Sequence, residues 1–310
     1  MRALVVDRTA PRHLRLGEAP EPVVAPHQAL VRVTAASLNF GEVSTVSRLP
    51  EATVPGWDAA GFVERPAADG SGPAVGTAVV TLDAAGGWAE LRAVDTASLG
   101  AAPEGADHGA LSTVPVAATS ALRALREVGF LLGRRILVTG ATGGVGRYAV
   151  QLARMGGAHV TACTGEPRTY GAELRGLGAH EVVSEPGELD YLVDGVVDCV
   201  GGPQLVTAFD RLNTGGTLVA VGHVTGRPEH FPLDAFLVDD GRHGRSITTF
   251  HLQNGVAPAG DLGWLAGRVA AGDLDPGISW RGSWDRADEA VAALLERRLR
   301  GKAVLELTAG

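Results

Sequence analysis

Short stretches of alternating apolar and polar residues fill the first third of the chain, a pattern that predicts strands separated by turns. Glycine and proline cluster between these stretches, and nine of the 17 prolines lie in residues 1–110. This spacing favours a small β-barrel or sandwich. The expected strands are Arg2–Val6, Ala29–Ala35, Gly61–Glu64, Ala78–Leu82 and Trp88–Ala93.

The middle of the chain has a longer period and no proline between Val116 and Glu166. Apolar runs typical of buried strands alternate with segments of helical spacing, which predicts a doubly wound parallel sheet and an α/β fold. The expected strands are Ile136–Thr139, His159–Cys163, Glu181–Val183, Gly195–Val200 and Gly215–Gly222. The expected helices are Val145–Met155, Tyr170–Leu177 and Gln204–Leu212.

The last part of the chain returns to a mixed pattern. It predicts β-structure over Ser246–Leu252, a helix over Ala259–Ala271 and a strand over Ala303–Leu307. A final helix is expected from Asp285, which can cap it, to Gly301. Its last turn would hold three arginines, Arg297, Arg298 and Arg300, as ordinary charge matched to the helix dipole.

Composition narrows the classes of function. The formal net charge of −8 disfavours a nucleic-acid or anionic-membrane partner. No run approaches 18 apolar residues and the first residues lack an apolar signal core, so a cytoplasmic protein is expected. The two cysteines, Cys163 and Cys199, exclude a disulfide framework and suit a reducing compartment.

The segment ILVTGATGGVG, residues 136–146, follows a strand and opens a helix, as a dinucleotide-binding loop requires. Gly143 and Gly144 would let the backbone approach a pyrophosphate, and Gly146 would let the helix pack on the sheet. The segment also fits the short-chain reductase pattern. That interpretation fails because the loop lies late in the chain and no tyrosine is followed by lysine at the fourth position.

Six segments together resemble the medium-chain dehydrogenase/reductase superfamily, in its zinc-independent quinone oxidoreductase and enoyl reductase branch. They are SLNFGEV (37–43), VPGWDAAGFVE (54–64), VAATSALRAL (116–125), ILVTGATGGVGRYAVQLARMGGAHV (136–160), VDCVGG (197–202) and RGKAVLEL (300–307). The resemblance implies a GroES-like catalytic domain over residues 1–115 and a Rossmann NADP-binding domain over residues 116–245. Residues 246–310 would return to the catalytic domain, and a homodimer is implied.

The form of the nicotinamide cofactor depends on the end of the second strand, where an acidic residue selects NAD. Thr164 stands there, and Glu166 lies two positions too late, inside a turn. Arg168 ends that turn and can bind a 2′-phosphate in bidentate fashion; the alternative is a solvated turn residue. NADPH is therefore the expected cofactor.

Metal-assisted chemistry is not expected, because residues 1–115 contain no cysteine and their three histidines lie outside the matching motifs. The resemblance assigns Asn39 and Thr119 to the nicotinamide and substrate region, where they would position rather than break bonds. The alternatives are a turn-stabilising side chain for Asn39 and a helix cap for Thr119. Asp58 is interpreted as a loop-ordering carboxylate.

The proton donor stays open. The three tyrosines all lie in the middle of the chain, so a donor would be His223, His251 or water, and each histidine could instead be structural. A small-molecule quinone or α,β-unsaturated carbonyl substrate is expected; the alternative is a cofactor-binding relative without turnover. The resemblance gives these cofactor-site residues: Asn39, Thr119, Gly143, Gly144, Val145, Thr164, Arg168, Ser184, Val200, Gly201, Val221, Gly222, His223, Phe250, His251 and Leu252.

Overall fold

The computed structural model describes residues 1–236, 242–253 and 256–307 of the chain, which divides into two compact units. The first unit comprises Met1–Thr119 and Gly255–Gly310, and the second comprises Ser120–Asn254. The first unit therefore runs slightly past residue 115, the boundary expected from the sequence, and the second runs past residue 245. Among the described residues, no helix combines the length and apolar character needed to cross a membrane.

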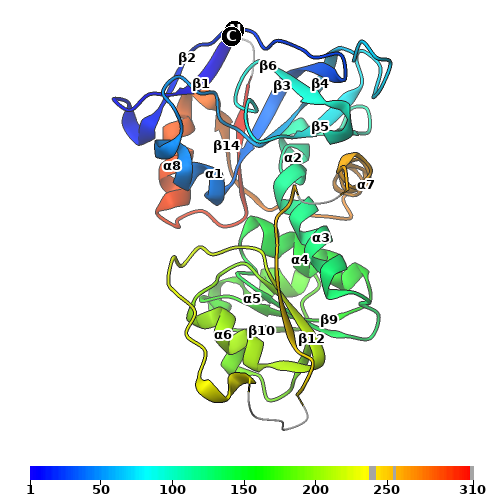
Figure 1. Ribbon diagram of the computed structural model, residues 1–310, viewed down its shortest axis with the longest axis vertical. Coiled ribbons are helices and arrows are strands. Elements are labelled where there is room, and N and C mark those ends of the chain that lie inside the picture. The colour runs from blue at the N-terminus through cyan, green and yellow to red at the C-terminus, as the bar shows by residue number, and fades with distance from the viewer. Residues whose placement is uncertain (237–241, 254–255, 308–310) are drawn as a thin grey trace. The chain divides into compact units, whose positions relative to one another are not determined.

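The first unit is built mainly on antiparallel strands, and its one parallel pair among the described residues is β14 with β15 (Figure 1). Its main sheet has the order β14-β15-β3-β4-β5-β7, with β6 also paired to β3, and β1 and β2 form a separate pair. The strand bounds are β1 Arg2–Val6, β2 Leu14–Glu18, β3 Gln28–Leu38, β4 Asp58–Arg65, β5 Ala78–Leu82, β6 Leu91–Asp95, β7 Leu99–Ala101, β14 Ile278–Ser283 and β15 Lys302–Glu306.

Four α-helices and a π-helical turn lie in the described part of this unit, besides short 3-10 turns, and one core joins its two chain segments. The helices are α1 Phe40–Thr45, α2 His108–Leu111, α7 Ala259–Ala270, α8 Ala287–Leu295 and a π-helical turn at Val114–Ala118. Buried residues of β3, β4, α8 and β15 form a single apolar cluster. The C-terminal segment thus completes the first unit, because β15 pairs with β3 in the sheet.

The second unit contains a six-stranded parallel sheet of order β10-β9-β8-β11-β12-β13. Numbered within the unit, this is 3-2-1-4-5-6, the order of a Rossmann sheet. The strands are β8 Arg135–Thr139, β9 His159–Cys163, β10 Glu181–Val183, β11 Val193–Asp198, β12 Leu212–Ala220 and β13 Ser246–Thr249. The helices are α3 Thr119–Val128, α4 Gly144–Met155, α5 Pro167–Gly176 and α6 Pro203–Asp210 (Figure 1).

Four expectations from the sequence are wrong. Residues 246–249 pair in parallel with β12, so they belong to the second unit rather than to the return segment. Trp88 lies outside β6, fully buried in a bend. The last helix begins at Ala287 after a turn capped by Ser283, and it ends at Leu295. The three arginines 297, 298 and 300 therefore follow the helix, since Arg297 has a φ of 57°.

Candidate active site

Most predicted cofactor residues of the second unit lie at one edge of its sheet. The carboxyl ends of parallel strands meet at the same edge, where doubly wound folds bind their ligands. Thr139, Cys163, Asp198 and Ala220 end β8, β9, β11 and β12. The segments that follow these strands and β10 and β13 hold the predicted residues Gly143, Gly144, Val145, Thr164, Arg168, Ser184, Val200, Gly201, Val221, Gly222, His223, Phe250, His251 and Leu252.

The glycine loop after β8 is closely folded. Gly140 has a φ of 61°, and Gly143 occupies the N-cap position of α4. A Cβ on Gly146 would lie 2.3 Å from the carbonyl oxygen of Gly140, so only glycine fits there. At Gly143 the nearest atom to such a Cβ is the same oxygen, at 3.3 Å. The first-turn amides of Gly144 and Val145 have no partner within the helix and offer an anion site.

Asp198 ties three strand ends together. Its Oδ1 accepts a hydrogen bond from Thr139 Oγ1 at 2.5 Å and its Oδ2 accepts one from the Gly201 amide at 2.8 Å. Its backbone carbonyl accepts from the Val221 amide at 2.8 Å. The side chain is fully buried, and burial raises the pKa of its carboxyl. Asp198 thereby fixes the loops after β11 and β12, a role the sequence analysis did not assign.

His223 is held by a carboxylate. Its Nε2 lies 2.6 Å from Glu229 Oε1, which also accepts a hydrogen bond from the Gly202 amide at 2.7 Å. That amide, and then His223, lower the pKa of Glu229. A Cβ on Gly201, which has a φ of 72°, would lie 2.3 Å from His223 Cδ2. The imidazole is thus oriented against the loop after β11 while 46% of its side chain stays exposed.

The segment after β13 carries Phe250, His251 and Leu252. The Leu252 carbonyl accepts a hydrogen bond from Arg123 Nη1 at 3.0 Å, which attaches the segment to α3. His251 is exposed, and its ring makes no hydrogen bond to any residue that the structure describes. This histidine is accordingly available to a ligand.

The end of β9 lacks an acidic residue, as the sequence indicates. Thr164 is buried, and its hydroxyl oxygen accepts a hydrogen bond from the Glu166 amide at 3.4 Å. Arg168 is the second residue of α5 rather than the end of a turn. Its guanidinium is exposed and pairs with no carboxylate in the described ranges. A free cation therefore lies at the start of α5.

Ser184, the residue after β10, donates both of its hydrogen bonds to the carboxylate of Glu188. Its amide donates a hydrogen bond to Glu188 Oε2 at 3.0 Å, and its hydroxyl donates a very short one to Glu188 Oε1. These two bonds lower the pKa of Glu188. Both donors of Ser184 are thus satisfied by the protein, which leaves none for a cofactor.

In the first unit, Asn39 belongs to a buried polar cluster that we define as Ser37, Asn39, Glu42, Asp58 and Lys302. Its Nδ2 donates to Asp58 Oδ2 at 2.8 Å and to Glu42 Oε1 at 3.1 Å. Its Oδ1 accepts from Lys302 Nζ at 2.6 Å. The amide is therefore engaged on both sides by charged or titratable side chains. Neither Glu42 nor Lys302 was singled out from the sequence.

Asp58 and Glu42 accept further hydrogen bonds that connect this cluster to the surrounding backbone. Asp58, with no exposed surface, accepts hydrogen bonds from Ser37 Oγ at 2.7 Å and the Val116 amide at 2.8 Å. Glu42 accepts from the amides of Asn39 at 2.8 Å and Trp57 at 2.7 Å. Burial and then the neighbouring Asp58 raise the pKa of Glu42 to about 8, while the two amides act in the opposite direction. Asp58 thus orders the loop before β4, α1 and the turn before α3.

Thr119 lies at the junction of the π-helical turn and α3, fully buried. Its hydroxyl donates a long hydrogen bond, 3.4 Å, to the Val114 carbonyl. The side chain thus acts as a donor to the preceding turn, whereas a helix cap would accept from a following amide.

The titratable side chains bonded to the Asn39 amide are two carboxyl groups, Glu42 and Asp58, and the ammonium group of Lys302. Within the described ranges, no three His, Cys, Asp or Glu side chains converge in a way that could hold a metal. Trp57 occupies the position next to Asp58, and the ammonium of Lys302 already supplies the cation for Asp58, 3.4 Å away. The cluster is therefore organised around a lysine.

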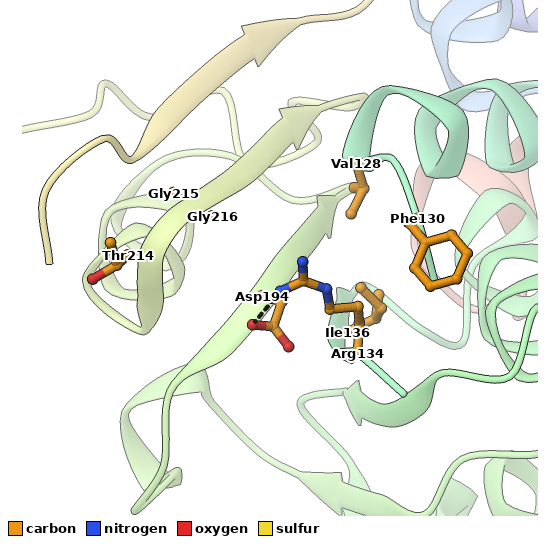
Figure 2. Close-up of a pocket in the computed structure, with 8 residues that line it drawn as sticks. All are labelled: Val128, Phe130, Arg134, Ile136, Asp194, Thr214, Gly215 and Gly216. Atoms are coloured by element: carbon orange, nitrogen blue, oxygen red, sulfur yellow. Dashed lines mark hydrogen bonds and ion pairs between the residues drawn. The ribbon is translucent and has the colours of Figure 1, made fainter. Parts of the chain in front are cut away.

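A cavity of about 240 Å³ lies at the amino ends of β8, β11 and β12, the edge opposite the glycine loop (Figure 2). Arg134 and Asp194 pair across it at 3.3 Å, with Val128, Phe130 and Ile136 beside them. It contains none of the predicted site residues, and its wall includes Gly215 and Gly216 of β12, where the register between β11 and β12 is irregular. We assign it no part in the reaction.

Comparisons with known proteins agree with the two-unit architecture described above. Residues 25–119 match the family model of the alcohol dehydrogenase GroES-like domain, and residues 177–305 match that of the zinc-binding dehydrogenases. The chain is 28% identical over 291 residues to a quinone oxidoreductase of Pongo abelii, covering 86% of this chain and 88% of the relative.

Two solved structures extend the likeness to the whole chain. The quinone oxidoreductase of Coxiella burnetii has 25% identity and a TM-score of 0.84, with 99% of each chain covered. The quinone oxidoreductase of Thermus thermophilus, described also in its complex with NADPH, has 28% identity and a TM-score of 0.80, covering 99% of this chain and 100% of that one. The chain belongs to the medium-chain dehydrogenase/reductase superfamily, in its quinone oxidoreductase branch.

Proposed function

We propose that this oxidoreductase transfers hydride from NADPH to a quinone or an α,β-unsaturated carbonyl compound, without zinc. The observation that carries the proposal is the glycine loop at the carboxyl edge of the parallel sheet. There the steric requirement for Gly146, the open face of Gly143 and the free amides of α4 provide a pyrophosphate site.

The cofactor preference rests on the end of β9. Thr164 provides no carboxylate to accept a hydrogen bond from the ribose 2′-hydroxyl, and Arg168 is an exposed, unpaired guanidinium among the described residues. These features favour a 2′-phosphate and hence NADPH. The complex of the Thermus thermophilus relative with NADPH supports the same choice.

The cofactor, when bound, supplies a hydride to the electron-poor carbon of the alkene or to the quinone. The substrate's own carbonyl stores the negative charge, so no metal is needed to polarise it. Asn39 and Thr119 would position the reacting groups. His223, oriented by Glu229, and His251, which is exposed, are the protein's candidate donors of the proton that completes the reduction; water is the third.

Loss of NADPH absorbance in the presence of a panel of quinones and enones tests the proposal. We expect turnover with at least one member and much weaker turnover with NADH. Tight NADPH binding without turnover on any member would instead favour a cofactor-binding protein of the same fold.

A further inference from the structure

Lys302 is the single lysine of the chain, which has 26 arginines. It opens β15, and its side chain is only 2% exposed. Burying an ammonium group is unfavourable unless its protons are all matched by acceptors. In a chain that has arginine at all its other Lys/Arg positions, the one lysine therefore occupies a buried position.

Three acceptors meet the three protons of this ammonium group. They are the Leu38 carbonyl at 2.9 Å, Asn39 Oδ1 at 2.6 Å and Asp58 Oδ2 at 3.4 Å. Such converging acceptors suit a compact ammonium, whereas the planar fork of an arginine needs acceptors in its own plane. The shortest of the three bonds goes to Asn39, the residue whose amide is only partly buried.

Lys302 determines which way that amide faces. An ammonium can only donate, so the atom 2.6 Å from it must be the oxygen of Asn39. The two protons on Nδ2 then go to Asp58 and Glu42. The hydrogen-bonding capacity left on the half-buried amide is one lone pair of Oδ1, so Asn39 can accept a hydrogen bond from a ligand but cannot donate one.

We infer that Lys302 is a positioning residue, which holds Asn39 so that its amide oxygen accepts a hydrogen bond from the carboxamide N–H of the nicotinamide. This inference rests on the proposed function, which places Asn39 at the nicotinamide. Lys302 touches neither cofactor nor substrate and acts through Asn39.

A double-mutant cycle tests the inference. Lys302→Met and Asn39→Ala are each expected to lower kcat/KM for NADPH by about tenfold or more, because each removes the oriented acceptor. The double variant is expected to be no worse than Asn39→Ala alone. Unchanged kinetics in Lys302→Met, or an equal loss from Lys302→Met in both backgrounds, would overturn the inference.

A second variant separates positioning from folding. Lys302→Met leaves Asp58 buried without its cation, so Asp58→Asn is added to neutralise the cluster. We expect this pair to fold like the wild type, by circular dichroism and melting temperature, and to stay impaired. Full recovery of activity would show a merely structural role and overturn the inference. Lys302→Arg should stay impaired too, while Arg281→Met, at a surface ion pair beside β15, should behave as wild type.

The dissociation constant of NADPH is also determined for each variant of the double-mutant cycle, by fluorescence titration. If the effects of Lys302→Met and Asn39→Ala on this constant are not additive, but no quinone or enone is turned over, the result contradicts the proposed function and supports the inference. Turnover accompanied by no coupling in either measurement would contradict the inference alone.

Discussion

Two buried ionisable side chains, those of Arg92 and Glu42, bind the loop before β4. Arg92 is 2% exposed and donates to the carbonyls of Gly56 at 3.1 Å, Trp57 at 3.1 Å and Ala85 at 2.9 Å. Burial lowers the pKa of this guanidinium to about 10. Glu42 holds the Trp57 amide from the other side. The backbone of Trp57 is thus held between an arginine and a carboxyl group that also accepts a hydrogen bond from the Asn39 amide.

The raised pKa of Glu42 makes stability depend on pH. The folded state retains a proton up to about pH 8, whereas the unfolded chain releases it near 4.5, so the contribution is full below 4.5 and is lost as the pH rises through 8. Glu42→Gln, which imitates the neutral acid, should flatten this fall by up to about 1.4 kcal/mol per pH unit. Urea unfolding of both proteins from pH 5 to 8 checks this, and parallel pH profiles would refute it.

Arg168 is expected to discriminate between the two nicotinamide cofactors. Arg168→Glu would place a negative charge against a 2′-phosphate and should weaken NADPH binding by about tenfold or more, or at least about 1.4 kcal/mol. NADH, which lacks this phosphate, should bind nearly as before. Fluorescence titration with both cofactors measures the difference, and equal effects on both would argue against this assignment.

At the scale of elements, the site depends on how closely α4 approaches the end of β8. The contact is between Gly146 and the backbone of Gly140 and Ala141, with a Cβ on Gly146 falling 2.8 Å from Ala141 Cα. Helix packing and the proposed pyrophosphate site therefore depend on the same glycine loop.

Gly146→Ala should consequently destabilise the protein by about 1–3 kcal/mol, since the backbone must move to admit one methyl group. Gly143→Ala is the matched control, because its φ of −79° suits alanine and its nearest contact is 3.3 Å. Denaturant unfolding compares the two variants. Equal losses of stability at both positions would show that the loop is not packed as described.

Local patterns predicted many of these elements from the sequence. Strands β1, β5, β9 and β10 have the expected bounds, because each is a short apolar or alternating run between clear turn signals. The strand β2 was missed since only Leu14 in it is buried, and β7 since its sequence, LGA, contains no β-branched or aromatic residue. The end of α8 was misplaced because three arginines extend a helical composition beyond the last turn that packs on the core.

At the scale of the whole molecule, the site residues depend on contacts between distant parts of the chain. Lys302 and Asn39 are 263 residues apart, and they meet because β15 pairs with β3. The sequence could indicate Asn39 and the glycine loop through family resemblance. It could not reveal Lys302 as a partner of Asn39, since nothing local to either residue specifies the pairing. Glu42 is different, because it stands three residues after Asn39 in the spacing of a capping box, a local signal that was overlooked.

The predicted homodimer belongs to this scale as well. Strand β13 ends the parallel sheet, with Ile247 37% exposed, and an exposed sheet edge is a surface on which another chain can add. We expect light scattering to give twice the chain mass of 31.8 kDa at micromolar concentration. A mass of one chain at every concentration would rule out the dimer.

The most direct test of the central claim is deuterium transfer from NADPH labelled at C4 of the nicotinamide to an enone substrate. With the two stereospecifically labelled forms, we expect one of them to place a single deuterium on the β-carbon of the saturated product, detected by mass spectrometry and NMR. A reduced product that carries no deuterium from either form, or no reduction of any enone or quinone by the NADPH-bound protein, would contradict the account.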